Sequence, residues 1–270
     1  MNRKKALTIA GSDSGGGAGI QADLKTFQEL DVYGMSAITA ITAQNTLGVS
    51  GVHPVPISMI VSQLEAIALD LSPDAIKTGM LFSSEVIEAV TECIKKSQWK
   101  NIVIDPVMIA KGGASLLQNE AIMSMKKNLL PLATIVTPNI PEAEVLTGTS
   151  IQSMEDRKTA AMILYDFGVD HIVIKGGHSD DIMAVDLYYN GEYFEEISTQ
   201  RLNTKNTHGT GCTFSAAITA ELAKGSSIEN AVMTAKHFIH AAIKYDLHIG
   251  SGHGPTNHWA YKQLQGEAIL

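Results

Sequence analysis

The chain has 270 residues, of which 45% are hydrophobic and 18% charged, and these proportions are typical of a folded globular protein rather than a disordered one. A formal net charge of −8 disfavours binding to nucleic acid or to an anionic membrane through a broad basic surface. Two cysteines are too few for a disulfide framework or a cysteine-rich zinc site, so the cytoplasm is the expected compartment.

Short apolar segments predict β-strands in chain order. They lie at residues 6–10, 37–43, 75–78, 102–104, 134–137 and 171–174. Amphipathic helical patterns separate most of them, at residues 59–71, 86–94 and 160–167, with Ser83 as an N-cap of the second. This alternation predicts an α/β fold, in which a mostly parallel central sheet lies between two helical layers, α/β/α.

The first apolar run, residues 6–10, is too short for a signal peptide. Residues 32–64 contain no Asp, Glu, Lys or Arg, but they are too rich in polar residues and Gly for a membrane span and are interpreted as buried strands and site loops. Asn190 and Gly191, flanked by residues 186–189 and 192–197, predict a small antiparallel hairpin at the sheet edge. No repeat or linker divides the chain, so one domain over residues 1–270 is expected.

Polar or glycine-rich turns follow the predicted strands, and ligands of parallel sheets bind at these carboxyl ends. The turn at residues 11–19 is glycine-rich, but Ile20 stands where GxGxxG needs its third Gly and Gly17 where a Walker A motif needs Lys. The pattern alone leaves ligand contact and a tight strand-to-helix turn open.

A second glycine-rich segment, residues 206–213, runs into a small-residue helix at 214–224 that ends at Gly225. Backbone amides at a helix N-terminus form an anion site, suited to a transferring phosphoryl group. The same field would lower the pKa of Cys212 and make it a proton acceptor, although a buried apolar cysteine fits the spacing nearly as well. His208 is more typical of a hydrogen-bonding group than of a base, and the histidine spacing gives no zinc site.

Hard oxygen ligands follow two neighbouring strands. Asp105 ends one, and Asn139 with Glu142 begin the helix after the next, which is a combination that suits Mg²⁺. Lys175, at the end of strand 171–174, is placed to meet a nucleotide phosphate. Helix capping by Asn139 and Glu142, and a surface position for Lys175, are the alternatives.

Together these segments resemble the ribokinase superfamily, and within it the hydroxymethylpyrimidine/phosphomethylpyrimidine kinase branch. The matching stretches are residues 10–23, 42–45, 77–80, 105–108, 137–143 and 207–213. They occur in order over nearly the whole chain. Most ribokinase-like sugar kinases carry Asp as the base where this chain has Cys212, and cysteine there is similar to the pyrimidine and pyridoxine kinase branches.

The resemblance implies site roles for particular residues. Gly11, Asp23, Gln44 and Met80 would line the pyrimidine pocket; Asp105 and Glu142 would hold Mg²⁺; Asn139 and Lys175 would contact ATP; and Gly209, Thr210, Gly211 and Cys212 would form the catalytic anion hole. The cofactors implied are ATP and Mg²⁺. The partner implied is a small heteroaromatic alcohol, and a homodimer is a family-level expectation.

The implied reaction is ATP-dependent phosphorylation of 4-amino-5-hydroxymethyl-2-methylpyrimidine and then of its monophosphate, in thiamine biosynthesis. A pyridoxine or pyridoxal kinase of the same fold is the nearest alternative. A hydrolase using Cys212 and His208, and a non-catalytic nucleotide-binding module, are alternatives from other classes.

Overall fold

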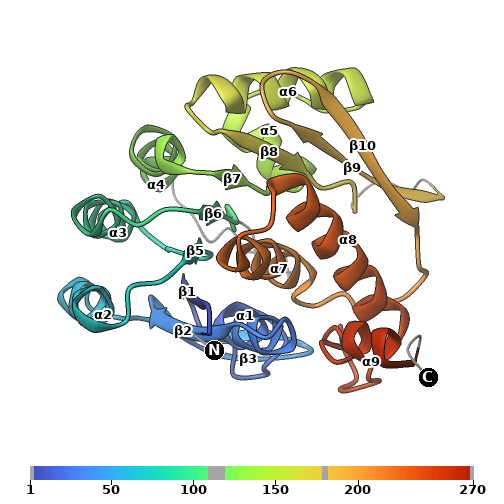
Figure 1. The fold of residues 1–270 in the computed structure, drawn as a ribbon, viewed down its shortest axis with the longest axis horizontal. Helices are drawn as coiled ribbons and strands as arrows, with labels where there is room; N and C mark the ends of the chain where they lie inside the picture. Colours follow the sequence, from blue (N-terminus) through green and yellow to red (C-terminus); the bar gives the residue numbers. More distant parts are fainter. Residues whose placement is uncertain (1–2, 109–118, 178–181, 268–270) are drawn as a thin grey trace.

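The computed structural model describes residues 3–108, 119–177 and 182–267. Its central sheet has eight strands in the order β10-β9-β8-β7-β6-β5-β1-β2 (Figure 1). In chain order they are β1 (Lys5–Ala10), β2 (Tyr33–Ile38), β5 (Ala75–Thr78), β6 (Ile102–Ile104), β7 (Ile135–Val136), β8 (His171–Ile174), β9 (Met183–Tyr189) and β10 (Phe194–Gln200). Neighbouring strands pair in parallel along the run β2-β1-β5-β6-β7-β8, which confirms the predicted mostly parallel sheet.

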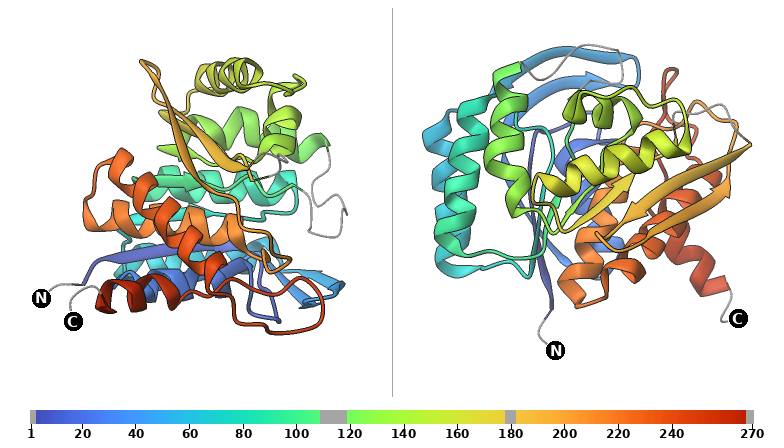
Figure 2. Two further views of the ribbon diagram at one scale, coloured as in Figure 1. Left: turned by 90° about the vertical axis from the view of Figure 1, so that its right-hand side faces the viewer. Right: turned by 90° about the horizontal axis from the view of Figure 1, so that it is seen from above.

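Helices cover both faces of this sheet (Figures 1 and 2). One hydrophobic core includes residues of α2 (Ile57–Asp70), α3 (Ser84–Ser97), α4 (Asn119–Ser124), α5 (Ile140–Thr147) and α6 (Met154–Asp166). The other core joins the sheet to α1 (Gly19–Glu29), α7 (Thr210–Lys224) and α8 (Ile228–Lys244), with α9 (Ala260–Glu267) packed on α8. A π-helical turn at Met125–Leu129 and a 3₁₀ turn at Leu130–Leu132 precede β7. The predicted three layers are confirmed.

The amphipathic pattern explains why α3 packs as it does. Its Val86, Ile87, Val90 and Ile94 are buried against the core, and Ser83 caps its N-terminus by accepting a hydrogen bond from the Val86 amide. A fully buried Ile or Leu contributes roughly 2 kcal/mol through removal of apolar surface from water. By contrast, α7 is buried over most of its length, because its small side chains let it lie between the sheet and α8.

The predicted edge hairpin is confirmed, and its strands extend beyond the predicted residues 186–197. The strands β9 and β10 pair antiparallel from Met183 to Gln200, and β8 pairs antiparallel with β9. At the turn, the Asn190 side chain accepts two backbone hydrogen bonds and Gly191 has a φ of +88°. This ribbon forms one edge of the sheet (Figure 2).

The single strand predicted at residues 37–43 is wrong. The chain leaves the central sheet after β2, and β3 (Ala40–Asn45) pairs instead with β4 (Gly48–Pro54) in a separate two-stranded sheet. Backbone hydrogen bonds of Thr39 to Ala10 and Val55 hold the chain at the point of departure. The expected burial of this region is also wrong for β4, whose residues are all exposed.

Candidate active site

A cavity of about 750 Å³ lies at the carboxyl ends of the parallel strands, where the sequence predicts the ligand site. The ends of β1, β5, β6, β7 and β8 contribute Gly11, Gly79, Asp105, Asn139 and Lys175, respectively, to its lining. The β3–β4 hairpin and the first turn of α7 supply further walls. Its volume is in the range typical of small-molecule sites.

The cavity is lined by three of the residues predicted to form a substrate pocket, namely Gly11, Gln44 and Met80. A Cβ atom on Gly11 would collide with the methyl group of Met80, so glycine is needed for the Met80 side chain to lie where it does. Thr39 Oγ1 donates a 2.7 Å hydrogen bond to the Met80 carbonyl and fixes this turn. The structure therefore places all three residues in the wall of one cavity.

Asp23, the fourth predicted pocket residue, does not line the cavity. Its carboxylate is fully buried and accepts hydrogen bonds from Lys77 Nζ and Thr8 Oγ1, each at 2.6 Å. Lys77 does line the cavity, although its side chain is also inaccessible to water. Burial alone would lower the pKa of Lys77, but Asp23 raises it above its usual value, so the ammonium charge is retained. Of the Lys77–Asp23 ion pair, it is therefore the ammonium group of Lys77 that lies next to the cavity.

Two loops meet beside Gln44. His208 Nε2 lies 2.8 Å from Asp13 Oδ2 and 3.3 Å from Gln44 Nε2. The Asp13 carboxylate also accepts hydrogen bonds from the amides of Gly15, Gly17 and Ala18. Burial alone would raise the pKa of Asp13, but these donors together lower it below its usual value. His208 thus has the hydrogen-bonding role that the sequence favours.

A charged cluster forms a second part of the cavity. Lys175 Nζ donates to Asp105 Oδ1 at 3.1 Å, and Ser215 Oγ lies 3.3 Å from Asp105 Oδ2. Burial raises the pKa of Glu142 to about 7, Lys175 opposes this rise, and Asp105 adds to it. The pKa of Lys175 is raised, because the attraction of Asp105 and Glu142 exceeds the effect of burial.

Asn139 and Glu142 also form a capping box at the start of α5. Glu142 Oε2 accepts from the Asn139 amide at 2.8 Å, and Asn139 Oδ1 accepts from the Glu142 amide at 2.9 Å. Both residues line the cavity as well, so the capping alternative and the ligand role coexist. The box directs a buried carboxylate toward Lys175 and Asp105.

The two carboxylates fit the demands of Mg²⁺, which binds proteins through one or two carboxylates and otherwise through phosphates and waters. Within residues 3–108, 119–177 and 182–267, there is no group of three or more His, Cys, Asp and Glu side chains that would chelate a metal without such ligands.

The first turn of α7 faces this cluster. Gly209 is its N-cap, with a φ of +81°, and a Cβ atom there would collide with the Gly17 carbonyl. A Cβ atom on Gly211 would lie 3.3 Å from Lys175 Nζ and 3.7 Å from Asp105 Oδ2. Thr210 and Cys212 also line the cavity. The first amides of a helix lack intrahelical acceptors, so they and Lys175 attract an anion to the same place.

Cys212 is half-buried in this turn, and the expectation that the helix lowers its pKa is wrong for the free protein. Burial raises the pKa of the thiol to about 11; Lys77 opposes the rise, and Asp23 and Asp105 add to it. A thiol with that pKa is ionised in about one molecule in 10,000 at pH 7. Burial and the two carboxylates therefore keep the thiol protonated.

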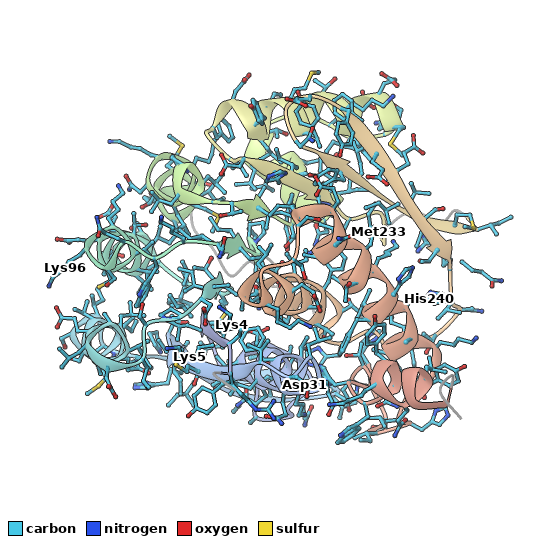
Figure 3. All side chains as sticks on the ribbon, in the orientation of Figure 1. Lys4, Lys5, Asp31, Lys96, Met233 and His240 are labelled. Carbon is cyan, nitrogen blue, oxygen red and sulfur yellow. The ribbon has the colours of Figure 1, made fainter. Side chains whose placement is uncertain are left out.

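The sequence interpretation missed the opposite wall of the cavity. It is formed by residues 199–202, at the end of β10 and just beyond it, and by Ile239, His240 and Ile243 of α8. Figure 3 labels His240. Lys236 and Asp186 also line the cavity, and Lys236 Nζ donates to Asp186 Oδ2 at 2.7 Å. A signal was present in the apolar face of α8, but only the fold shows that it meets the β9–β10 ribbon.

Comparisons with known proteins identify the family. The family model described as phosphomethylpyrimidine kinase matches residues 13–257. The hydroxymethylpyrimidine/phosphomethylpyrimidine kinase of Bacillus subtilis is 56% identical over 264 residues, 97% of each chain. That of Haemophilus influenzae is 54% identical over 272 residues, 97% of this chain and 99% of the relative.

A solved structure carries the same fold. The pyridoxal kinase from Staphylococcus aureus, in complex with AMP-PCP and pyridoxal, matches with a TM-score of 0.91 and 46% identity, over 98% of this chain and 96% of that one. The ribokinase-like fold is thereby confirmed, and neither a cysteine hydrolase nor a non-catalytic module is supported. The chain belongs to the hydroxymethylpyrimidine/phosphomethylpyrimidine kinase family.

Proposed function

We propose that this protein transfers the γ-phosphoryl group of ATP to the hydroxymethyl group of 4-amino-5-hydroxymethyl-2-methylpyrimidine, and a second one to the resulting monophosphate. One observation carries the proposal: a single cavity is lined both by Gly11, Gln44 and Met80, the proposed ring end, and by Lys175 and the first turn of α7, the proposed charged end. Relatives that are 56% and 54% identical carry the name of this kinase.

The proposed ring end of the cavity suits an aminopyrimidine. Such a ring has polar edges and apolar faces, so the Gln44 amide would bind an edge while the Met80 thioether packs against a face. Gly11 leaves room for Met80 at this position. The hydroxymethyl group would then point toward Cys212 and Lys77, which line the same cavity.

The charged end suits the triphosphate of ATP. Lys175 and the amides of Gly209, Thr210, Gly211 and Cys212 would bind the transferring phosphoryl group and stabilise the charge that develops on it. Asp105 and Glu142 would hold Mg²⁺, and Asn139 fixes Glu142 through the capping box. When bound, Mg²⁺ supplies neutralising charge between phosphate oxygens.

Cys212 is the residue proposed to accept the proton of the acceptor hydroxyl, a role that only its minor thiolate form can perform. Its thiol is protonated in the free protein, so the phosphoryl transfer must proceed largely without prior thiolate, through positioning and charge stabilisation. A bound phosphate, by contrast, is already ionised near neutral pH. The second phosphorylation therefore needs less from Cys212 than the first.

Separation of the products tests the proposal. Purified protein is incubated with ATP, Mg²⁺ and the pyrimidine alcohol, and the mono- and diphosphate are resolved by anion-exchange chromatography over time. The monophosphate should rise first and the diphosphate should follow. Absence of any phosphorylated pyrimidine would reject the kinase assignment, and a monophosphate that is never converted would reject the second step alone.

A pyridoxal kinase activity is the second candidate, because the S. aureus structure with pyridoxal is similar over nearly the whole chain. Pyridoxal also carries a hydroxymethyl group on a heteroaromatic ring. Parallel assays with pyridoxal and the pyrimidine alcohol at equal concentrations separate the two activities. A larger kcat/KM for pyridoxal would reverse the assignment.

A homodimer in the cytoplasm completes the proposal. Ile41, Leu47, Val49 and Val52 are 38–74% exposed on the β3–β4 hairpin. Residues 40–54 carry no Asp, Glu, Lys or Arg that would oppose contact with a second copy. Light scattering should therefore give twice 28.9 kDa, and Leu47→Asp should shift the mass toward that of one chain. No helix in the described ranges is long and apolar enough to cross a membrane.

A further inference from the structure

The side-chain amide of Gln44 lies between two polar groups from different segments. Its nitrogen is placed 3.3 Å from His208 Nε2, and its oxygen is placed 3.4 Å from Thr42 Oγ1. A half-turn about the last side-chain bond exchanges these two atoms without moving anything else. Which atom faces which neighbour is therefore decided by the hydrogen atoms that the neighbours carry.

His208 must carry a hydrogen on Nε2. The Asp13 carboxylate, 2.8 Å from this nitrogen, already accepts three backbone N–H groups, of Gly15, Gly17 and Ala18. A carboxyl hydrogen would have no acceptor among these donors, so Asp13 is ionised and accepts from the imidazole as well. His208 therefore donates its one Nε2 hydrogen to Asp13. The amide oxygen fits beside this N–H because it can share the hydrogen, whereas an NH₂ group would point its own hydrogens at it.

Thr42 has no hydrogen left for Gln44. Its hydroxyl donates to the Ser12 carbonyl at 2.8 Å, which is a much shorter contact than the 3.4 Å to the Gln44 amide. A threonine hydroxyl has one hydrogen and two lone pairs, so toward Gln44 it acts as an acceptor. The amide atom beside Thr42 must consequently be the donor.

We propose that Asp13, His208 and Thr42 are positioning residues that lock the Gln44 amide with its oxygen toward His208 and its NH₂ toward Thr42. Each neighbour favours this orientation, and both are held by short hydrogen bonds to the glycine-rich turn at residues 11–19. The inference rests on the proposed function, because it assumes that Gln44 binds the edge of the substrate ring.

A locked amide makes the site selective for one order of donor and acceptor on that edge. A 4-aminopyrimidine presents an amino N–H beside a ring nitrogen that accepts, and the amide oxygen and N–H can pair with both. A 4-oxopyrimidine presents an oxygen beside a ring N–H, which is the reverse order. The ring cannot turn over to compensate, because its hydroxymethyl group must stay toward the charged end of the cavity.

The test compares 4-amino-5-hydroxymethyl-2-methylpyrimidine with its 4-oxo counterpart. Dissociation constants from calorimetry and kcat/KM values are measured for wild type, Thr42→Val, Thr42→Ser and His208→Leu. Ser14→Ala is the matched control, because the Ser14 hydroxyl bonds the Gln44 backbone at 2.7 and 2.8 Å and not its amide. Thermal unfolding checks that each variant folds; if His208→Leu does not, the two Thr42 variants decide.

Wild type should prefer the amino ring by roughly 100-fold or more, as expected of a site built to hydrogen-bond its substrate. Thr42→Val and His208→Leu should each reduce this preference about tenfold or more, largely through tighter binding of the oxo ring, since the amide can then turn. Thr42→Ser should keep the preference, and Ser14→Ala should affect both rings equally.

An unchanged preference in Thr42→Val and His208→Leu would overturn the lock while leaving the kinase assignment intact. An equal loss in Thr42→Ser and Thr42→Val would overturn it too, because the hydroxyl would then be irrelevant. Wild type that binds neither ring would instead overturn the proposed function, and the inference with it.

Discussion

Replacement of Glu142 by Gln should stabilise the metal-free protein at neutral and alkaline pH. It should also raise the Mg²⁺ concentration that the enzyme needs for activity. Glu142 is 5% exposed, and burial raises the pKa of its carboxyl to about 7, with Lys175 lowering and Asp105 raising it further. Gln keeps an oxygen that can accept the Asn139 amide of the capping box. The substitution therefore removes the charge with little change of shape.

The size of the effect follows from the difference between the folded and unfolded pKa. The ordinary value is 4.5, and the folded value is about 7, so the folded protein binds this proton more tightly. The contribution of the carboxyl to stability is then greatest below pH 4.5 and is lost as the pH rises through about 7. Above that pH the ionised carboxylate destabilises the free protein by roughly 3 kcal/mol, a cost that is absent from the Glu142→Gln variant because its amide stays neutral.

Urea unfolding in EDTA at pH 5, 6, 7 and 8 measures this directly. The free energy of unfolding of Glu142→Gln minus that of wild type should grow over this range and level off near pH 8. Glu144→Gln, on the same helix but outside the cavity lining, is the control. A difference that does not change with pH, or a variant less stable at pH 8, would refute the reasoning. In activity assays, the Mg²⁺ concentration for half-maximal rate should increase.

Three further substitutions probe the rest of the site. Cys212→Ala should slow the first phosphorylation more than the second when each is assayed separately; equal losses would exclude proton acceptance by the thiol. Lys77→Met should cost about 3–5 kcal/mol of unfolding free energy in urea, because it strands Asp23 in the interior, and Lys77→Met with Asp23→Leu should recover much of it. Gly209→Ala should lower kcat about 100-fold or more by moving the first turn of α7 away from Gly17, and a near-normal rate would contradict the assigned close approach.

The parts of the fold that the sequence predicts correctly are those with local signals. The strands at Ala75–Thr78, Ile102–Ile104 and His171–Ile174 agree with the structure to the residue, because each is a short apolar run between polar turns and is buried on both faces. The β3–β4 hairpin was missed for the opposite reason. The strand β4 is exposed throughout, so its sequence has no alternation, and its turn lacks the Asn-Gly pair that marks β9–β10.

The candidate site divides in the same way. Asp105, Asn139, Lys175 and the first turn of α7 follow from position, since they stand at strand ends or at a helix N-terminus. Asp23 was placed in the pocket by family resemblance, but a carboxylate so deeply buried needs a partner, and Lys77 is that partner. A lysine between the buried residues Ile76 and Thr78 was the available signal, since lysine is rarely buried without an opposite charge.

The wrong expectation for Cys212 shows where local reasoning fails. The expectation considered only the field of the helix itself, whereas burial and the carboxylates Asp23 and Asp105, which lie on other segments, raise the pKa of the thiol. Gln44 is a second case, because His208 lies 164 residues further along the chain and yet influences which atom of the Gln44 amide, the oxygen or the nitrogen, faces it. The chemistry of the site thus depends on pairs that only the folded sheet brings together, and its substrate preference should respond to substitutions at residues that do not touch the substrate.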